Sequence, residues 1–181
     1  MDDNEILELY RSGERQQAFN LIVRKYKERL YWHIRNMVNV HEDADDLLQN
    51  TFVKVWNSLD TFREDSKLYT WLYRIATNET ISFLRRERLR NVLSFTDNDR
   101  YLDSFFASDP FFNGDKIQTA VRKAIAKLPP KQRTVFTMRY FDELKYEEMS
   151  EILGTSEGAL KASYHHAFNK VQEWVKEELE V

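Results

Sequence analysis

The chain has 181 residues, 42% of them hydrophobic and 31% charged, a balance that excludes wholesale disorder and predicts a globular protein. It has no cysteines, which excludes disulfides, thiolate metal sites and cysteine nucleophiles, and its four glycines and three prolines are too few for a strand-and-turn protein. The formal net charge is −3, whereas a strong free-standing nucleic-acid binder is usually basic. The many charged and long straight-chain residues favour an all-α fold.

Four helices are expected in residues 1–92, which we predict to pack as one small bundle. The first is a short helix around 3–11, and longer ones follow over 14–38, 42–58 and 66–89. An amphipathic stripe marks the buried face of the helix over 14–38: Phe19, Ile22, Tyr26, Leu30, Ile34 and Met37. The N-terminal MDDNEILELY lacks a signal-type apolar core, and no apolar run is long enough to span a bilayer, so we expect a cytoplasmic protein without membrane insertion.

Residues 93–115 break every period and predict a flexible acidic linker. They carry five acidic groups and one basic group, whereas residues 1–92 and 116–181 are each close to neutral. The aromatic residues of this segment either pack back on a domain or insert into a partner: Phe95, Tyr101, Phe105, Phe106, Phe111 and Phe112.

A second small bundle is expected in residues 116–181, with helices over 116–127, from Pro130 to about Phe141, over 145–153 and from 157 to about 178. Proline is favoured in the first turn of a helix, where no N–H donor is needed. Gly154 is a good C-cap and Ser156 a good N-cap for the last two helices. A helix, a short glycine-containing turn and a second helix are typical of a helix-turn-helix motif.

The last helix has two faces with different chemistry. Leu160, Tyr164, Ala167, Val171 and Val175 share the face expected in the core. The opposite face carries hydrogen-bond donors separated by small residues, a surface suited to a DNA major groove: Gly158, Lys161, Ala162, His165, His166 and Asn169. The alternative is an ordinary solvated face. Because adjacent helical residues point about 100° apart, the two histidines are not expected to share a metal ion.

A second outward stripe is expected on the helix over 66–89, where Trp71, Arg74, Asn78 and Arg85 stand at i, i+3, i+7 and i+14. An aromatic ring, a guanidinium and an amide suit an unpaired nucleic-acid strand, because rings stack on bases and arginine contacts phosphate. The polar loop DTFREDSK before the helix could hold an extruded base. The alternative is that Trp71 belongs to the core.

The helix over 42–58 also has an outward, partly apolar face, made of Asp45, Gln49, Val53 and Trp56 with Phe52 at its margin. Such a face binds a partner or is buried on a second side within its own bundle. The acidic residues near the start of this helix favour the positive end of its dipole rather than a metal. No glycine-rich phosphate loop, HExxH motif or nucleophile–base pair occurs, so we expect neither an enzyme nor a cofactor.

Four stretches occur in an order and spacing typical of one family: DADDLLQNTFVKVW, FREDSKLYTWLYRIATNETISFLRR, LPPKQRTVFTMRYF and YEEMSEILGTSEGALKASYHHAFNKV. The chain resembles bacterial sigma-70-family RNA polymerase sigma factors of the extracytoplasmic-function (ECF) group over about residues 10–90 and 116–176. The resemblance implies a sigma-2-like domain over 1–92, a linker over 93–115 and a sigma-4-like helix-turn-helix domain over 116–181. It implies a non-enzymatic subunit that binds core RNA polymerase and directs initiation at promoters with −10 and −35 elements.

The resemblance also implies which residues make each contact. The polymerase β′ clamp would be contacted by Asp45, Asp46, Gln49, Phe52, Val53 and Trp56. The −10 element would be recognised and melted by Arg63, Ser66, Lys67, Tyr69, Thr70, Trp71, Arg74 and Asn78. The −35 element would be read by Ser156, Gly158, Lys161, Ala162, His165, His166 and Asn169, on a domain that also contacts the polymerase β flap. An anti-sigma factor is a usual partner in this family.

The recognition helix departs from the arginine-rich pattern common in the family, because Ser163, His166 and Phe168 stand in it. Fewer fixed positive charges imply fewer phosphate contacts and less salt-sensitive binding. The other function considered is a stand-alone helix-turn-helix regulator with an N-terminal dimerisation domain. The outward face of the helix over 42–58 distinguishes the two functions. A regulator would use this face to bind a second copy of the chain, and a sigma factor would use it to bind polymerase.

Overall fold

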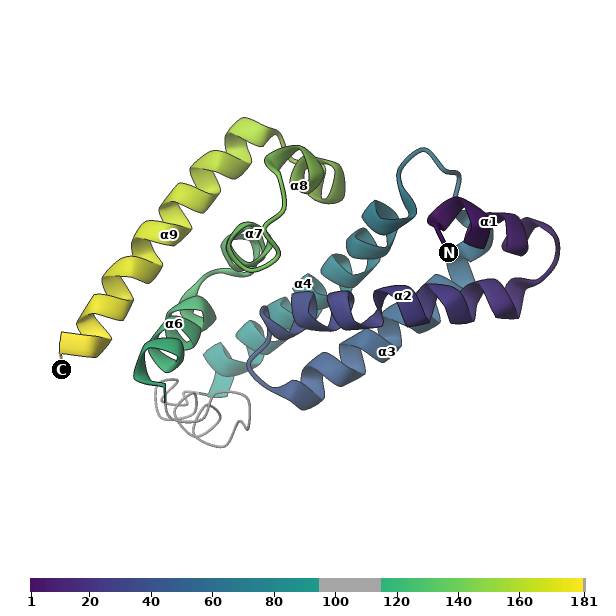
Figure 1. Ribbon diagram of the computed structural model, residues 1–181. Helices are drawn as coiled ribbons and strands as arrows, with labels where there is room; N and C mark the ends of the chain where they lie inside the picture. The colour runs from purple at the N-terminus through teal and green to yellow at the C-terminus, as the bar shows by residue number, and fades with distance from the viewer. Residues whose placement is uncertain (95–114, 181) are drawn as a thin grey trace.

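The computed structural model describes residues 1–94 and 115–180, and these residues form α-helices and one 3-10 turn, without strands. Figure 1 shows two groups of helices side by side, with the N-terminal group (purple to teal) on one side and the C-terminal group (green to yellow) on the other. The helices are α1 (Asp3–Arg11), α2 (Arg15–Arg35), α3 (His41–Ser58), α4 (Leu68–Ser94), α6 (Lys116–Lys127), α7 (Pro130–Tyr140), α8 (Tyr146–Leu153) and α9 (Glu157–Glu180). A 3-10 turn, η1 (Leu59–Thr61), follows α3.

The first bundle packs α1, α3 and α4 around α2. The predicted stripe of α2 is confirmed, because Ile22, Leu30 and Ile34 are fully buried and Tyr26 and Met37 nearly so. α1 begins with a capping box in which the Asp2 carboxylate accepts from the N–H of Glu5 and the Glu5 carboxylate accepts from the N–H of Asp2. A local capping box thus defines the start of α1, and one apolar stripe defines the buried side of α2.

In the second bundle, α6 and α7 pack against α9, and α8 leads into α9 through the predicted tight turn. Asp115 caps α6 by accepting from Ile117, and Pro130 opens α7. Gly154 ends α8 in the left-handed conformation, with φ 65°, and Ser156 accepts from the N–H of Ala159 at the start of α9. The helix-turn-helix predicted from the sequence is therefore present.

The two bundles contact each other along α4, against which α7 and α8 pack (Figure 1). Val135, Met138 and Leu144 of the second bundle belong to the same buried cluster as Leu72 and Ala76 of the first. Six consecutive residues of α7, positions 133 to 138, are buried. α7 lies between α4 and α9, and little of its surface in this region is exposed to solvent. Because α7 packs on both neighbours, the buried side chains of the two bundles form one continuous interior.

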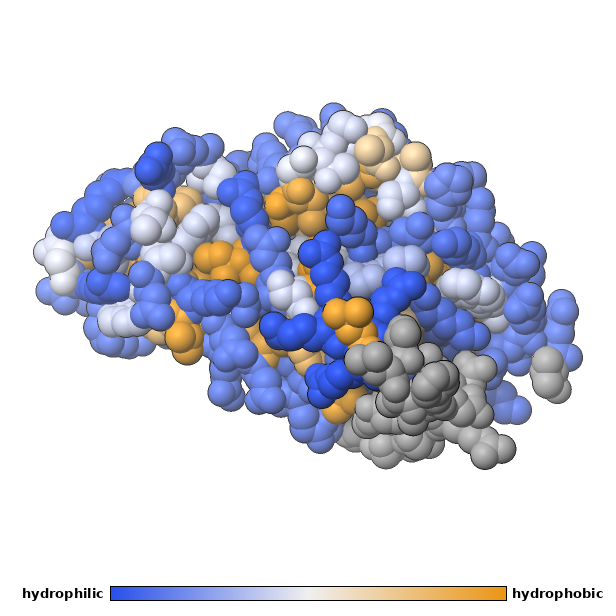
Figure 2. Space-filling view, turned by 180° about the vertical axis from the view of Figure 1, so that it is seen from behind, coloured by the Kyte–Doolittle hydropathy of each residue, from blue (hydrophilic) through white to orange (hydrophobic). Residues whose placement is uncertain are grey.

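α4 runs to Ser94, five residues beyond its expected end, and its last turns carry four exposed arginines, Arg85, Arg86, Arg88 and Arg90. In Figure 2 the most hydrophilic colours gather beside the grey residues, where this end of α4 lies. The linker aromatics Phe95, Tyr101, Phe105, Phe106, Phe111 and Phe112 lie outside the described residues. Within 1–94 and 115–180, no helix combines the length and the apolar content that crossing a bilayer requires.

Candidate functional site

The outward residues of α3, which we call the α3 face, are Asp45, Asp46, Gln49, Phe52, Val53 and Trp56. Ala44, Leu47 and Val55 point into the bundle and are buried. Val53, on the opposite side of the helix, is 57% exposed, and the two aspartates and the glutamine are exposed as well. An exposed valine ringed by polar groups is unused by the fold and available to a partner.

Phe52 and Trp56 have a double role on this face. Both are half-buried, and the Phe19 ring of α2 lies edge-on to each, at 6.3 Å from Phe52 and 5.1 Å from Trp56 between ring centroids. The Arg15 guanidinium lies 4.5 Å from the centre of the Trp56 ring and donates to the Trp56 carbonyl at 2.6 Å. Burial on a second side therefore holds in part, because the aromatic edge of the face packs on the bundle, whereas its centre faces outward.

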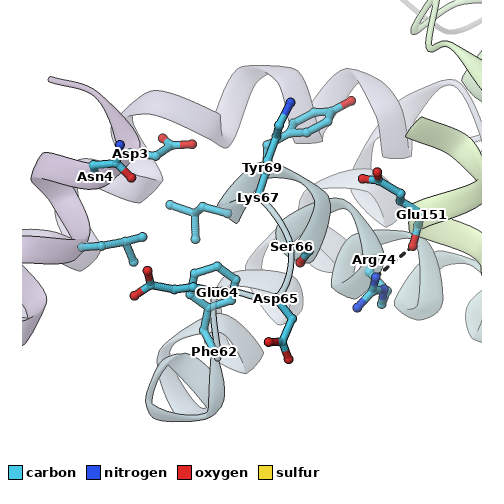
Figure 3. A pocket seen from close by; sticks show the side chains of 12 residues that line it. Asp3, Asn4, Phe62, Glu64, Asp65, Ser66, Lys67, Tyr69, Arg74 and Glu151 are labelled. Carbon is cyan, nitrogen blue, oxygen red and sulfur yellow. Dashed lines mark hydrogen bonds between the residues drawn. The ribbon is translucent and has the colours of Figure 1, made fainter. Parts of the chain in front are cut away.

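The residues assigned to the −10 element, which we call the α4 surface, are Arg63, Ser66, Lys67, Tyr69, Thr70, Trp71, Arg74 and Asn78. Several of them line a cavity of about 660 Å³ between the loop before α4, the start of α4 and α1. Figure 3 shows Lys67 and Tyr69 on one side of this cavity, Asp3 and Asn4 of α1 on another, and Phe62 and Glu64 opposite. The loop predicted to cup a base thus forms one wall of an open hollow.

The aromatic residues of α4 differ in their exposure. Tyr73 is fully buried, whereas Tyr69 and Trp71 are half-buried, with Trp71 against Phe62 at 5.2 Å between ring centroids. Burial raises the pKa of Tyr69 to about 12, and Arg29, 4.6 Å from the ring centre, acts in the opposite direction. The Tyr69 hydroxyl is buried and has no hydrogen-bond partner among the described residues. The Trp71 ring therefore packs on the bundle with one part and is exposed to solvent with the other.

Three members of the α4 surface are placed differently from one another. Thr70 is 2% exposed and packs inside the bundle in this arrangement, contrary to the outward position expected for it. Arg74 donates to the Glu151 carbonyl of α8 at 2.8 Å, as the dashed line in Figure 3 marks. Asn78 is exposed, but it borders a second cavity of about 400 Å³ between α4 and the second bundle.

The outward residues of the last helix, which we call the α9 face, are all exposed: Ser156, Gly158, Lys161, Ala162, His165, His166 and Asn169. Leu160, Ala167 and Val171 on the other side are buried, as the periodicity predicted. A side chain at Gly158 would meet no atom within 4 Å, so the start of the helix is sterically open. His165 and Asn169 are joined at 3.2 Å, one turn apart. The face offers a row of polar groups along a convex helix, the shape that enters a groove.

Some residues at these sites were not identified from the sequence. Phe62 supports Trp71 and lines the first cavity, and its place as the aromatic residue within the polar loop DTFREDSK was the available signal. Arg86, Arg88 and Arg90 extend the positive charge that begins at Arg85, next to the α4 surface, and the segment RRERLR could have indicated them. Asp3 and Glu151 reach the site from distant elements, and no local pattern points to them. Among the described residues, no group of three or more acidic or histidine side chains is arranged to hold a metal ion.

Comparisons with known protein families identify the two bundles. A family model described as sigma-70 region 2 matches residues 22–90, which span α2 to α4. A second, described as sigma-70 region 4, matches residues 118–171, which include the helix-turn-helix. The two matches together cover both outward surfaces of the first bundle and the recognition helix of the second.

Whole-chain comparisons agree with the domain matches. The chain is 34% identical to the ECF RNA polymerase sigma factor SigW of Bacillus subtilis, with 83% of this chain and 84% of that protein covered. It is 31% identical to the RNA polymerase sigma-H factor of Pseudomonas aeruginosa, with 91% and 89% covered. The sigma factor RpoE of Bartonella quintana, solved in complex with the anti-sigma factor NepR, matches with a TM-score of 0.67 at 26% identity, over 87% of this chain and 96% of that one. CnrH, solved in complex with the cytosolic domain of CnrY, has the same fold, with a TM-score of 0.66 at 23% identity over 97% and 98% of the two chains.

One chain thus joins a region 2 bundle, with outward surfaces on α3 and α4, to a region 4 helix-turn-helix with an exposed recognition face. The relatives named above are sigma factors that match over most of their own length. The chain belongs to the ECF group of sigma-70-family factors, the non-enzymatic promoter-specificity subunits that bind core RNA polymerase and promoter DNA.

Proposed function

We propose that the α3 face is the surface that binds the β′ clamp of core RNA polymerase. The support is geometric: Val53 is 57% exposed at the middle of the face, the Phe52 and Trp56 rings are held at its edge, and Asp45, Asp46 and Gln49 surround them. A central apolar group within a polar rim is the usual arrangement of an interface hot spot.

The α4 surface, in this proposal, recognises the −10 element and holds its melted strand. The open cavity of about 660 Å³ has room for an extruded base, and Lys67, Tyr69 and Phe62 border it. Base–aromatic stacking of about 1–3 kcal/mol per base offsets part of the cost of unstacking. The exposed arginines at the end of α4 would add contacts to the phosphates of the same DNA.

Replacing Trp71 with alanine should slow open-complex formation while leaving polymerase affinity near normal, because in this proposal the indole ring stacks on an unpaired base. The expected loss is about 1–3 kcal/mol, or about 5- to 150-fold in the melting equilibrium. Permanganate footprinting of the promoter measures melting, and titration with labelled core enzyme measures affinity. Phe83→Ala is the matched control, because Phe83 is another half-buried aromatic of α4 and lies outside the α4 surface. A loss of core affinity in Trp71→Ala would make Trp71 a structural residue only.

The α9 face, we infer, reads the −35 element in the major groove, on a domain that also contacts the β flap. The exposed donors of Lys161, His165 and Asn169 lie along one side of the helix, and the adjacent Ala162 and Gly158 permit close approach to base edges. The −35 preference is carried by these few residues, since the neighbouring Ser163 and Phe168 bring no charge.

Lys161→Ala should weaken transcription from promoters that depend on a −35 element by about 5- to 150-fold, corresponding to about 1–3 kcal/mol for a lost base or phosphate contact. Run-off transcription on matched templates with intact and scrambled −35 elements measures the effect. Lys176→Ala removes the same charge from the exposed far end of α9 and should leave the ratio of the two templates unchanged. Equal selectivity in both variants would contradict the recognition face.

Residues 1–92 would act as the polymerase-binding and −10 domain, residues 93–115 as the linker, and residues 116–181 as the −35 domain, in a protein that works in the cytoplasm. Two similar chains were solved bound to an anti-sigma factor or to the cytosolic domain of a second protein, which supports a partner of this kind for the present chain. The observation that carries the proposal is that Val53, the cavity before α4 and the whole α9 face are open to partners in one chain. Run-off transcription with core polymerase and a random promoter library tests it, and a chain that confers no start-site choice would refute it.

A further inference from the structure

One wall of the cavity before α4 comes from α1, a helix that the proposed −10 site does not include. Asp3, Asn4 and Leu7 line the cavity on this side, and Figure 3 shows Asp3 and Asn4 facing the loop residues from α1. Leu7 is 8% exposed, whereas Asn4 is exposed at the cavity. A base that enters the cavity therefore meets α1 as well as the loop.

The first turn of α1 is fixed on α2 by several contacts. The capping box described above closes the start of the helix. The Asp3 carboxylate accepts from the Lys25 ammonium at 2.8 Å and from the Tyr26 hydroxyl at 2.7 Å. Burial, followed by the contact with Asp3, raises the pKa of Tyr26, so the hydroxyl stays protonated and donates at neutral pH. The backbone of Asn4, next to Asp3, is thereby held in place at the cavity.

The end of α1 also holds the loop that forms the facing wall. The Arg11 guanidinium donates to the Glu64 carboxylate, and Arg15, at the start of α2, donates to the Asp60 carboxylate at 3.0 Å. Glu64 has φ 60°, a left-handed conformation that persists in a non-glycine residue only where neighbouring contacts fix it. Arg11 and Glu64 are about half exposed, so their ion pair adds little stability and acts mainly on the position of the loop.

The charges around the cavity give an entering nucleotide one orientation. The cations that line the cavity are Lys67 and Arg74, and Arg74 already donates to the Glu151 carbonyl. Lys67 forms no hydrogen bond or ion pair with a described residue, so its ammonium is available to phosphate. The walls formed by α1 and the loop carry the carboxylates of Asp3 and Glu64, which disfavour phosphate. A nucleotide therefore places its phosphate near Lys67 and its base edge toward α1.

Asn4 is the residue of this α1 wall whose hydrogen-bonding groups are unused. The Asp3 carboxylate is already bound to α2, and Leu7 is apolar. The Asn4 amide has no side-chain hydrogen bond with a described residue. An amide has an oxygen that accepts and an NH₂ group that donates, the groups that pair with the edge of an extruded base. The amide is thus placed to distinguish one base from another.

We propose that α1 belongs to the −10 site, an inference that rests on the function given above for the α4 surface. Asn4 is a specificity-determining residue that hydrogen-bonds the edge of one extruded base. Arg11 is a positioning residue that holds the facing loop through Glu64. The contacts that fix α1 then serve recognition, because a hydrogen bond discriminates between bases only when the amide is held in a defined position.

The base preference of the holoenzyme tests the role of Asn4. Core polymerase with the full chain transcribes templates that carry each of the four bases at each −10 position, and the ratio of the best to the worst base is measured. Asn4→Ala should lower this ratio about fivefold or more at one position and leave the other positions unchanged. Asn20→Ala is the matched control, because Asn20 is an exposed asparagine of α2 that does not line the cavity.

Asn4→Asp tests recognition of the base edge more directly, since the side chain keeps its size but a carboxylate only accepts. At the same position it should raise the preference for adenine and cytosine over thymine, because the edges of adenine and cytosine carry an amino donor. A residue that only stabilised α1 would change the yield of transcript for all bases equally. Equal base ratios in Asn4→Ala, Asn4→Asp and Asn20→Ala would overturn the role of Asn4.

A charge swap tests the positioning role of Arg11. Arg11→Glu places two carboxylates together, so the loop moves and the base ratio should fall about fivefold, as in Asn4→Ala. Adding Glu64→Arg to the same chain restores an ion pair of reversed order and should return the ratio to within about twofold of the wild type. Arg24→Glu makes the same charge change at an exposed position of α2 and should leave the ratio unchanged. A double variant no better than Arg11→Glu would overturn this role.

The same templates distinguish a failure of the α1 inference from a failure of the −10 function itself. Lys67→Ala and Trp71→Ala are measured beside the α1 variants. If these two variants alter promoter melting or base preference while the α1 variants match their controls, the α4 surface keeps its function and α1 is not part of the site. If base preference and melting are unchanged in all of them, the −10 role of the α4 surface and the role of α1 are both refuted.

Discussion

Replacing Val53 with glutamate should abolish transcription directed by this chain while leaving its free energy of unfolding within about 0.5 kcal/mol of the wild type. Val53 is 57% exposed and lies opposite the buried side of α3, so the new side chain meets only water in the free protein. In an interface whose centre is that valine, the carboxylate loses water and is left unpaired, beside the existing charges of Asp45 and Asp46. Such a burial costs several kcal/mol, which is at least a hundredfold in the dissociation constant for core polymerase.

The matched control is Leu179→Glu, another exposed aliphatic residue, 46% exposed near the end of α9. Affinity for core polymerase is measured by titration of labelled protein, and stability by urea denaturation of the same samples. Val53→Glu is a sharper test than Trp56→Ala, because Trp56 packs on Phe19 and Arg15 and its loss also disturbs the fold. If Val53→Glu and Leu179→Glu bind core enzyme equally well, the α3 face is not the polymerase contact.

Much of the fold follows from local rules that the sequence displays. The stripe on α2 predicted its buried side, and all but Phe19 of that set are buried. Helix ends were marked correctly by residues that act locally: Gly154 by its left-handed φ, Ser156 by its side-chain acceptor and Pro130 by its missing N–H. The α9 face was predictable for the same reason, since a helix with one apolar side leaves the other side outward.

The relation between the bundles was not predictable, because it depends on residues far apart in the chain. Arg74 meets a backbone carbonyl of Glu151, and any residue could supply that carbonyl. His33 and Arg133 appear in the sequence as ordinary polar residues, and only the packed structure shows them buried at one junction. Thr70 was expected to face outward because the family resemblance assigns it to the −10 element, yet it is buried, since a threonine is small enough to pack on either side of a helix.

One signal for this junction was present and was not used. α7 contains Thr134, Val135, Phe136, Thr137 and Met138 in succession, without the polar side that a surface helix needs. A helix without a polar side is buried on all sides, so it requires a second neighbour beyond its own small bundle. That neighbour is α4. The run of buried residues on α7 is therefore the sequence feature that indicates contact between the domains.

Phe136→Ala should remove most of the stability of the second domain. Phe136 is 1% exposed and stacks on Tyr140 and Tyr164, with ring centroids 5.1 and 5.9 Å away. Truncating a buried phenylalanine costs about 3–5 kcal/mol. A domain of about 65 residues has a total stability of roughly 3–10 kcal/mol, so the loss is a large share of the whole. Phe136 is the largest of the fully buried side chains in this core, where Ala124 and Ala167 are two of its neighbours.

The substitution is expected to disrupt the second domain and leave the first domain folded, so it distinguishes the functions of the two domains. Amide hydrogen exchange should rise strongly in α6 and α9 and remain slow in the buried part of α2, whose core does not contain Phe136. Transcription that depends on a −35 element should be lost, while core polymerase still binds through the α3 face. Phe168→Ala, at a ring that is 39% exposed on α9, should change hydrogen exchange little. If Phe136→Ala instead melts both domains together, the continuous interior along α4 is one cooperative unit, and the two domains do not fold independently in the free chain.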